Sequence, residues 1–263
     1  MLDIIVKVDH APSHPAWLDG VLALARRQQA FLTGLQVTVA CLDTSDTIAR
    51  SAGDNDDRAH GRRWWLELCR KADVNGEWEV IHTAIPEVFA KRSCLADFGI
   101  CELRIGAADA PAGLHEVTHT LFAHAVPMLL VPDIFYGNLR TDRIVIAWNG
   151  AAEIAHAIQA ALPLLTQASE VHVLDGERSG LPGISPPSLP LRTWLQRHNI
   201  AAQWHPFPAE HDEGPALLAA AKALCADLMV MGAWGRMRAG GPALGGATRW
   251  LLEHATLPLF VSR

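Results

Sequence analysis

The sequence carries the same pattern twice, and this internal repeat constrains the fold more than any other feature. A short apolar run at residues 4–9 returns about 140 positions downstream at residues 143–149. The segments 118–125 and 248–255 align without gaps, and each is followed by a proline (Pro127, Pro258) and a short apolar strand. Self-similarity at one long period indicates two copies of a structural unit, each of about 130 residues.

Strand and helix patterns alternate within each half. This alternation predicts right-handed βαβ units, and therefore an α/β fold of two tandem, doubly wound, five-stranded parallel sheets of the Rossmann-like type. We expect domains at 1–138 and 139–263, joined by a linker at 132–141. In the first half we expect strands at 4–9, 35–42, 78–83, 100–105 and 128–131, and helices at 15–31, 56–72 and 86–96. In the second half we expect strands at 143–149, 170–174, 201–206, 227–231 and 259–261, and helices at 152–166, 188–198 and 214–225.

The composition indicates which partners and which cellular compartment to expect for this chain. The formal net charge is -6, with 22 Lys+Arg against 28 Asp+Glu, so a nucleic acid has little electrostatic attraction to this chain. No apolar stretch reaches the roughly 20 residues that cross a bilayer. The apolar run that follows Asp3 is too short, and the start of the sequence too acidic, for a signal peptide. The five cysteines form no C-x-x-C pair, which is typical of reduced core thiols. We expect a cytoplasmic protein with no membrane or nucleic-acid partner.

A glycine-punctuated loop in the second half is the main candidate for a binding site. Gly232, Gly235 and Gly245 follow the spacing G-x2-G-x9-G and lead into a helix. Glycines let the backbone approach a ligand closely, and a helix start directs N–H groups at an anion, so the pattern favours phosphate. When Gly106 is aligned with Gly232, the first half has twelve residues to its helix and the second has sixteen. We therefore expect a first-half loop four residues shorter, and the ligand in the second half.

Together, the repeated strand, the Met231-Gly232 strand end, the glycine spacing and the closing helix–proline–strand resemble the universal stress protein family, as a tandem two-domain member. The resemblance implies an adenine nucleotide such as ATP in the second half. It implies that the base and ribose are contacted by Ala147, Trp148, Asn149 and Val173, and that the phosphate side is lined by Met231, Gly232, Gly235, Gly245, Gly246, Ala247 and Thr248. Asn149 stands where the family usually has an acid, and Gly246 where it usually has Ser or Thr. Arg236, Arg238 and Arg249 add positive charge nearby.

The same resemblance implies a stress-response protein that works by binding, with at most weak ATP hydrolysis and no designated catalytic residue. Its only metal would be a nucleotide-bound Mg²⁺. The two halves would pack as the subunits of family dimers do, which makes the chain a pseudo-dimer, and a further homodimer is left open. The first half would be a degenerate copy with an empty site. Trp148 and Trp234, at strand ends, could either stack on a base or fill the cavity.

Two alternatives come from other functional classes. His115-Glu116-Val117-Thr118-His119 matches H-E-x-x-H, which on a helix places His115 and His119 one turn apart to bind zinc, with Glu116 as general base. A zinc-dependent hydrolase is therefore an alternative, although these residues occupy the same place in the repeat as Gly245 to Arg249 and no third ligand follows on the same helix face. The other alternative is a structural or interaction protein that binds no nucleotide.

Overall fold

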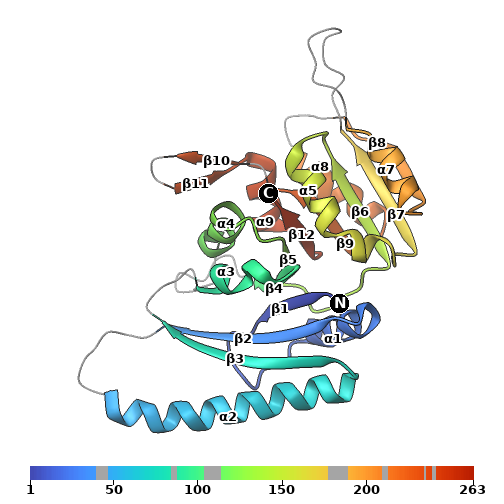
Figure 1. Cartoon of the computed structure of the whole chain (residues 1–263). Helices are drawn as coiled ribbons and strands as arrows, with labels where there is room; N and C mark the ends of the chain where they lie inside the picture. Colours follow the sequence, from blue (N-terminus) through green and yellow to red (C-terminus); the bar gives the residue numbers. More distant parts are fainter. Residues whose placement is uncertain are drawn as a thin grey trace. The chain divides into compact units, whose positions relative to one another are not determined.

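The computed structural model describes residues 1–39, 47–83, 88–103, 114–176, 189–208, 213–233, 235–238 and 241–263. Its contacts define two compact units: unit 1 is Met1–Val126 with Tyr136–Leu139, and unit 2 is Pro127–Phe135 with Arg140–Arg263. Figure 1 shows the helices and strands of both units. Among the described residues, no helix combines the length and the apolarity needed to span a bilayer.

Unit 1 contains a parallel sheet with the strand order β3-β2-β1-β4. The buried apolar run of the first repeat forms β1, and its residues Ile4, Ile5 and Val6 are at most 1% exposed. The described elements are β1 (Asp3–Lys7), α1 (Ala16–Gln28), β2 (Phe31–Val39), α2 (Thr47–Ala72), β3 (Asn75–Thr83), α3 (Val88–Arg92), a 3-10 turn (Ser93–Leu95), β4 (Phe98–Leu103) and α4 (Leu114–Ala123).

Unit 2 contains a sheet with the order β5-β12-β9-β6-β7-β8, in which every neighbouring pair is parallel except β5 and β12. Its central strand β6 carries the second copy of the repeated run, and Ile144, Val145 and Ile146 are fully buried. The elements are β5 (Met128–Pro132), β6 (Arg143–Trp148), α5 (Ala152–Ala160), α6 (Leu162–Leu165), β7 (Glu170–Asp175), α7 (Leu191–Arg197), β8 (Ala202–Pro206), α8 (Glu213–Ala223), β9 (Leu228–Gly232), β10 (Gly235–Arg238), β11 (Gly241–Leu244), α9 (Gly246–His254) and β12 (Leu259–Ser262).

The predicted α/β class with a mostly parallel sheet in each half is confirmed. One strand pairs differently from the expectation. β5, expected as the last strand of the first half, belongs to unit 2 and runs antiparallel to β12, with Leu130 opposite Leu259. This pairing covers the edge of β12, whose backbone would otherwise offer unpaired N–H and C=O groups. The domain boundary at 138/139 stays a prediction.

Several element boundaries differ from the sequence-based expectation. Helix α2 begins at Thr47 rather than 56, so it extends through the weak helix formers Gly53, Asp54 and Asn55. The single helix expected at 152–166 is divided into α5 and α6, and Pro163, which has no N–H to donate, lies in the first turn of α6. Residues inside the glycine loop form an antiparallel hairpin of β10 and β11, in which Gly235 pairs with Leu244. The segment 175–190, whose glycines and prolines predict an irregular surface excursion, lies mostly outside the described residues.

The backbone fixes how the two halves correspond. In unit 1, Asp97 N donates to Asp3 O at 2.8 Å, and Asp97 Oδ2 accepts from Asp3 N at 2.7 Å. In unit 2, Asp227 makes the same two bonds to Arg143, at 2.8 and 2.9 Å. Asp3 therefore corresponds to Arg143, and Asp97 to Asp227. From these anchors, β1 is offset by 140 positions from β6, and β4 by 130 positions from β9.

This correspondence corrects the predicted alignment of the two strand ends. Gly232 corresponds to Glu102, not to Gly106, and the same offset of 130 continues without a gap to Thr118 and Thr248. The count from Glu102 to Thr118 therefore equals the count from Gly232 to Thr248. Because β4 ends later and α4 begins earlier than β9 and α9 do in this correspondence, the connection between strand and helix is still three residues shorter in unit 1 (104–113) than in unit 2 (233–245). The halves also differ in glycine content, because Glu102, Ile105, His115 and Glu116 stand where the second half has Gly232, Gly235, Gly245 and Gly246.

The cysteines divide by burial, which leads to a first prediction. Cys69 and Cys101 are 2% exposed, and burial raises the pKa of the Cys69 thiol to about 11 and also raises that of Cys101. Cys94 and Cys225 are exposed. Since the thiolate is the reactive form, we expect a thiol reagent at pH 8 to label Cys94 and Cys225 within minutes and to leave Cys69 and Cys101 unlabelled until the chain is unfolded. Peptide mass mapping of the labelled protein measures this, and labelling of Cys69 in the native protein would contradict the packing described.

Candidate functional site

A pocket of about 340 Å³ opens in unit 2 at the carboxyl ends of β6 and β9. From β6 the chain winds outward to β7 and β8, then crosses back to β9 and β12 on the other side of β6. The point between β6 and β9 is therefore the place where the winding direction reverses, and it is where ligands of open α/β sheets bind. The volume lies within the range of about 300–1,000 Å³ that is usual for small-molecule sites.

Most of the residues expected from the sequence meet at this pocket. Nine of the eleven line it: Ala147, Trp148, Asn149, Met231, Gly232, Gly245, Gly246, Ala247 and Thr248. Val173 does not line it, because it is fully buried in the middle of β7. Gly235 begins the β10 strand, and its part in the site stays a prediction. Trp234 lies outside the described residues.

Gly232 and Gly246 are glycines for different reasons. A Cβ at Gly232 would lie 2.6 Å from Ile154 N, because the start of α5 passes directly over the end of β9. A side chain there is excluded by the fold itself. A Cβ at Gly246 would meet no atom within 4 Å. Protein packing therefore does not require a glycine at 246, and its missing side chain leaves open space inside the pocket.

The pocket ends on the amino terminus of α9. Gly245 is the N-cap residue, with φ -67° and ψ 157°, and no side chain caps the helix there. Gly245 O accepts the first intrahelical bond, from Arg249 N at 2.9 Å. The first turn of an α-helix directs its N–H groups beyond the helix end, and the helix dipole adds partial positive charge there. An anionic group fits this end of the pocket.

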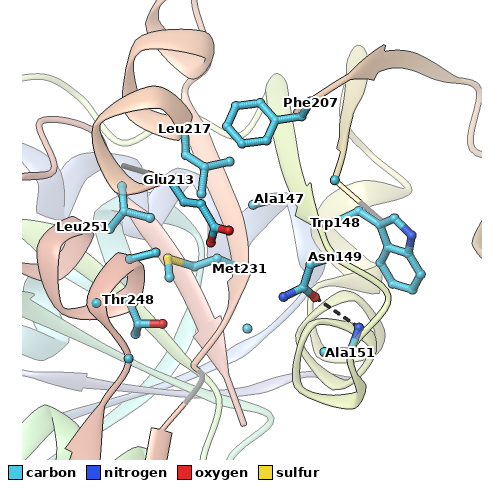
Figure 2. Close-up of a pocket in the computed structure, with 15 residues that line it drawn as sticks. Ala147, Trp148, Asn149, Ala151, Phe207, Glu213, Leu217, Met231, Thr248 and Leu251 are labelled. Carbon is cyan, nitrogen blue, oxygen red and sulfur yellow. Dashed lines mark hydrogen bonds between the residues drawn. The ribbon is translucent and has the colours of Figure 1, made fainter. Parts of the chain in front are cut away.

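Asn149 turns its amide into the pocket. Its Oδ1 accepts a hydrogen bond from Ala151 N at 3.1 Å, so its amide nitrogen is directed towards the cavity, as Figure 2 shows. An aspartate or glutamate at this position would offer only hydrogen-bond acceptors to a ligand, whereas Asn149 offers a donor. Trp148 lines the pocket, but in Figure 2 its indole lies on the far side of Asn149 from the cavity, and the residue is 3% exposed, so the ring packs into the protein.

The structure adds pocket residues that the sequence reasoning missed. Phe207 directly follows β8, and its ring faces the cavity near Leu217 (Figure 2). Glu213 begins α8 and points its carboxylate into the cavity (Figure 2). An aromatic residue directly after a strand was the available signal for Phe207. The other added lining residues are Ala151, Gly176, Leu217 and Leu251.

One of the three arginines expected near the pocket has a described side chain. Arg249 does not line the pocket. Its side chain is 63% exposed and its Nε donates to Glu253 Oε1 at 2.7 Å, one turn along α9. The side chains of Arg236 and Arg238 lie outside the described residues. Among the lining residues that the structure describes, Glu213 is the one with a charged side chain.

The H-E-x-x-H segment lies on α4, as its spacing predicts, but Glu116 is engaged elsewhere. Lys7 Nζ donates to Glu116 Oε2 at 2.7 Å, and the two side chains are 6% and 11% exposed. A carboxylate held in a buried ion pair is poorly suited to act as the general base of a zinc hydrolase. The side chain of His115 is not described, and no group of three or more His, Cys, Asp or Glu among the described residues could hold a metal ion.

Comparison with known proteins gives the fold a family context. No protein-family model and no curated protein matches the sequence. A universal stress protein from Archaeoglobus fulgidus DSM 4304 has a similar structure, with 14% identity and a TM-score of 0.70 over 100% of this chain and 96% of that one. A protein of Pseudomonas aeruginosa UCBPP-PA14 described as a universal stress protein matches with 15% identity and a TM-score of 0.62, over 99% and 92% of the two chains.

The same fold occurs in another setting. The cytoplasmic domain of a prokaryotic cation chloride cotransporter matches with 12% identity and a TM-score of 0.53, over 99% of this chain and 95% of that one. The chain therefore has the fold of universal stress proteins, built as two similar halves. Because one fold supports several functions, the function has to be argued from the site.

Proposed function

We propose that this chain is a binding protein of the universal stress type, and that unit 2 holds one adenine nucleotide in the pocket between β6, β9 and α9. One observation carries the proposal: the pocket lies at the switch point of the sheet, and one end of it is the uncapped amino terminus of α9. Both features suit a ligand with a flat apolar part and an anionic part. A nucleotide is such a ligand.

The lining divides into an anionic end and a nucleoside end. Gly245, Gly246 and Ala247 would offer backbone N–H groups to the phosphates, and the open space at Gly246 gives the phosphates room to approach. Phe207, Leu217, Met231 and Leu251 form an apolar wall around the cavity, suited to the base. Asn149 would donate from its amide to an acceptor on the ligand, and Mg²⁺ would enter as the counter-ion of the nucleotide.

Glu213 has a role in the same proposal. A carboxylate in a nucleotide pocket can accept hydrogen bonds from both ribose hydroxyls, as acids do in dinucleotide-binding folds. Glu213 is placed for this because it opens α8 and turns into the cavity (Figure 2). Its negative charge disfavours a phosphate beside it, which orients the nucleotide with its phosphates towards α9.

Isothermal titration with ATP, AMP and adenosine tests the proposal. We expect ATP and AMP to bind at one site per chain and adenosine to bind more weakly, because only the phosphorylated ligands reach the α9 end. If none of the three ligands binds in this titration, the chain has the nucleotide-independent role that the sequence left as an alternative. Equal affinity for AMP and adenosine would remove the assignment of α9 as the phosphate site.

Phe207→Ala measures the contribution of the base. Stacking of a base on an aromatic ring contributes about 1–3 kcal/mol, so we expect ATP affinity to fall by about 5- to 150-fold. Phe135→Ala provides a comparison, because this phenylalanine lies in unit 2 but does not line the pocket. Equal ATP affinity in the wild-type protein and Phe207→Ala would show that the base does not lie against this ring.

A further inference from the structure

The place in unit 1 that corresponds to the nucleotide pocket contains a buried ion pair. By the backbone correspondence, Lys7 stands where unit 2 has Ala147, and Glu116 stands where it has Gly246. In unit 2 these two small residues line the open pocket. In unit 1 the two long side chains meet, with Lys7 Nζ 2.7 Å from Glu116 Oε2.

The correspondence of α4 and α9 is supported by burial as well as by sequence. Thr118 and Thr248 are 6% and 4% exposed, and Leu121 and Leu251 are both fully buried. The two helices therefore present equivalent faces to equivalent sheets. Glu116 lies in the first turn of α4, the same helix end that would hold phosphate in α9. Its carboxylate is an anion at the helix amino terminus, supplied by the chain itself.

A third charged group completes the arrangement. Asp9, which corresponds to Asn149, has its Oδ1 3.8 Å from Lys7 Nζ. One buried ammonium thus lies between two carboxylates, with side-chain exposures of 6% for Lys7, 11% for Glu116 and 27% for Asp9. A buried lysine requires such partners, and their geometry fixes all three side chains in the space that a ligand would need.

We propose that the first copy of the site is closed by its own residues: Glu116 occupies the position of the phosphate, Lys7 fills the space beside it, and the chain therefore binds one nucleotide rather than two. The sequence predicts only that the site in the first half is empty. The proposal adds that two side chains, Lys7 and Glu116, close this site and that their removal reopens it. The inference rests on the proposed function for the identity of the ligand, and on the geometry of unit 1 for the closure.

The double variant Lys7→Ala/Glu116→Gly, which copies the residues of unit 2, tests the closure. Native mass spectrometry with ATP is expected to show one bound nucleotide in the wild-type protein and two in this variant. Adding Gly246→Glu to the double variant is expected to return the count to one. The exposed pair in Glu67→Ala/Lys71→Ala serves as a matched control and is expected to leave the count at one. A folded double variant that still binds one nucleotide would overturn the inference.

A second variant covers the case in which the double variant does not fold. The variant Ala147→Lys/Gly246→Glu introduces the same pair of side chains into unit 2. We expect its crystal structure to show the ion pair and its ATP binding to be abolished. Unimpaired ATP binding would overturn the inference. If the wild-type protein binds no nucleotide, the proposed function fails on its own. The crystal structure of Lys7→Ala/Glu116→Gly then decides the closure: a cavity between β1 and α4 supports it, and a collapsed site overturns it.

Discussion

Lys7→Ala is expected to lower the free energy of unfolding by about 3–5 kcal/mol, which is the usual effect of removing one partner of a buried ion pair. The reason is that Glu116, 11% exposed, would keep its charge with its nearest cationic partner gone. Urea denaturation followed by circular dichroism measures the change. Lys91→Ala, at an exposed lysine on α3, is expected to alter the same free energy by less than about 0.5 kcal/mol.

The companion variants show whether the effect comes from the pair itself. Glu116→Ala should destabilise the protein to a similar degree, and Lys7→Ala/Glu116→Ala should be more stable than the sum of the two single effects predicts, because neither charge is then left alone. Additive effects in this cycle would contradict the description of Lys7 and Glu116 as one interacting unit.

Gly246→Glu is expected to abolish nucleotide binding while the protein stays folded. The new side chain extends into open space, and its carboxylate lies at the helix end assigned to phosphate, where like charges oppose each other by several kcal/mol. A loss of at least about 100-fold in ATP affinity corresponds to about 2.7 kcal/mol. Stability should not fall, because an acid in the first turn of a helix is favourable and glycine is a poor helix former.

Two substitutions at the same position separate size from charge. Gly246→Ala adds one carbon and Gly246→Gln has the length of glutamate without its charge, so we expect ATP affinity to decrease in the order Ala, Gln, Glu. Titration calorimetry gives the affinities, and thermal melting gives the stabilities. An unchanged affinity in Gly246→Glu would place the phosphates away from α9.

The sequence was sufficient to predict the parts of the fold that depend on local pattern. The continuous apolar runs predicted β1 and β6 as buried central strands, since parallel strands are covered on both faces. The site residues at the ends of β6 and β9 were predicted from the resemblance to universal stress proteins, and they meet at one pocket because parallel strands end at one edge of the sheet. Phe207 and Glu213 were missed because they come from connections whose path depends on tertiary packing.

The predicted match of Gly106 to Gly232 was wrong for a physical reason that involves Gly232. The alignment treated glycine as the conserved mark of the strand end and matched Gly106 to Gly232. In unit 2 that glycine is required by the start of α5, which follows β6 after three residues. In unit 1 eight residues separate β1 from α1, and Glu102 occupies the corresponding position. Because Gly232 is required by the start of α5, a glycine was not to be expected at the corresponding position of unit 1.

The number of ATP molecules bound per chain tests the central claim most directly. Native mass spectrometry of this 263-residue chain with saturating ATP and Mg²⁺ should show one nucleotide on each chain, and none when the same titration is repeated with Gly246→Glu. That pair of results would place the ligand at the α9 end of the unit 2 pocket. A wild-type protein without nucleotide, or a Gly246→Glu protein that still carries one, would contradict the account.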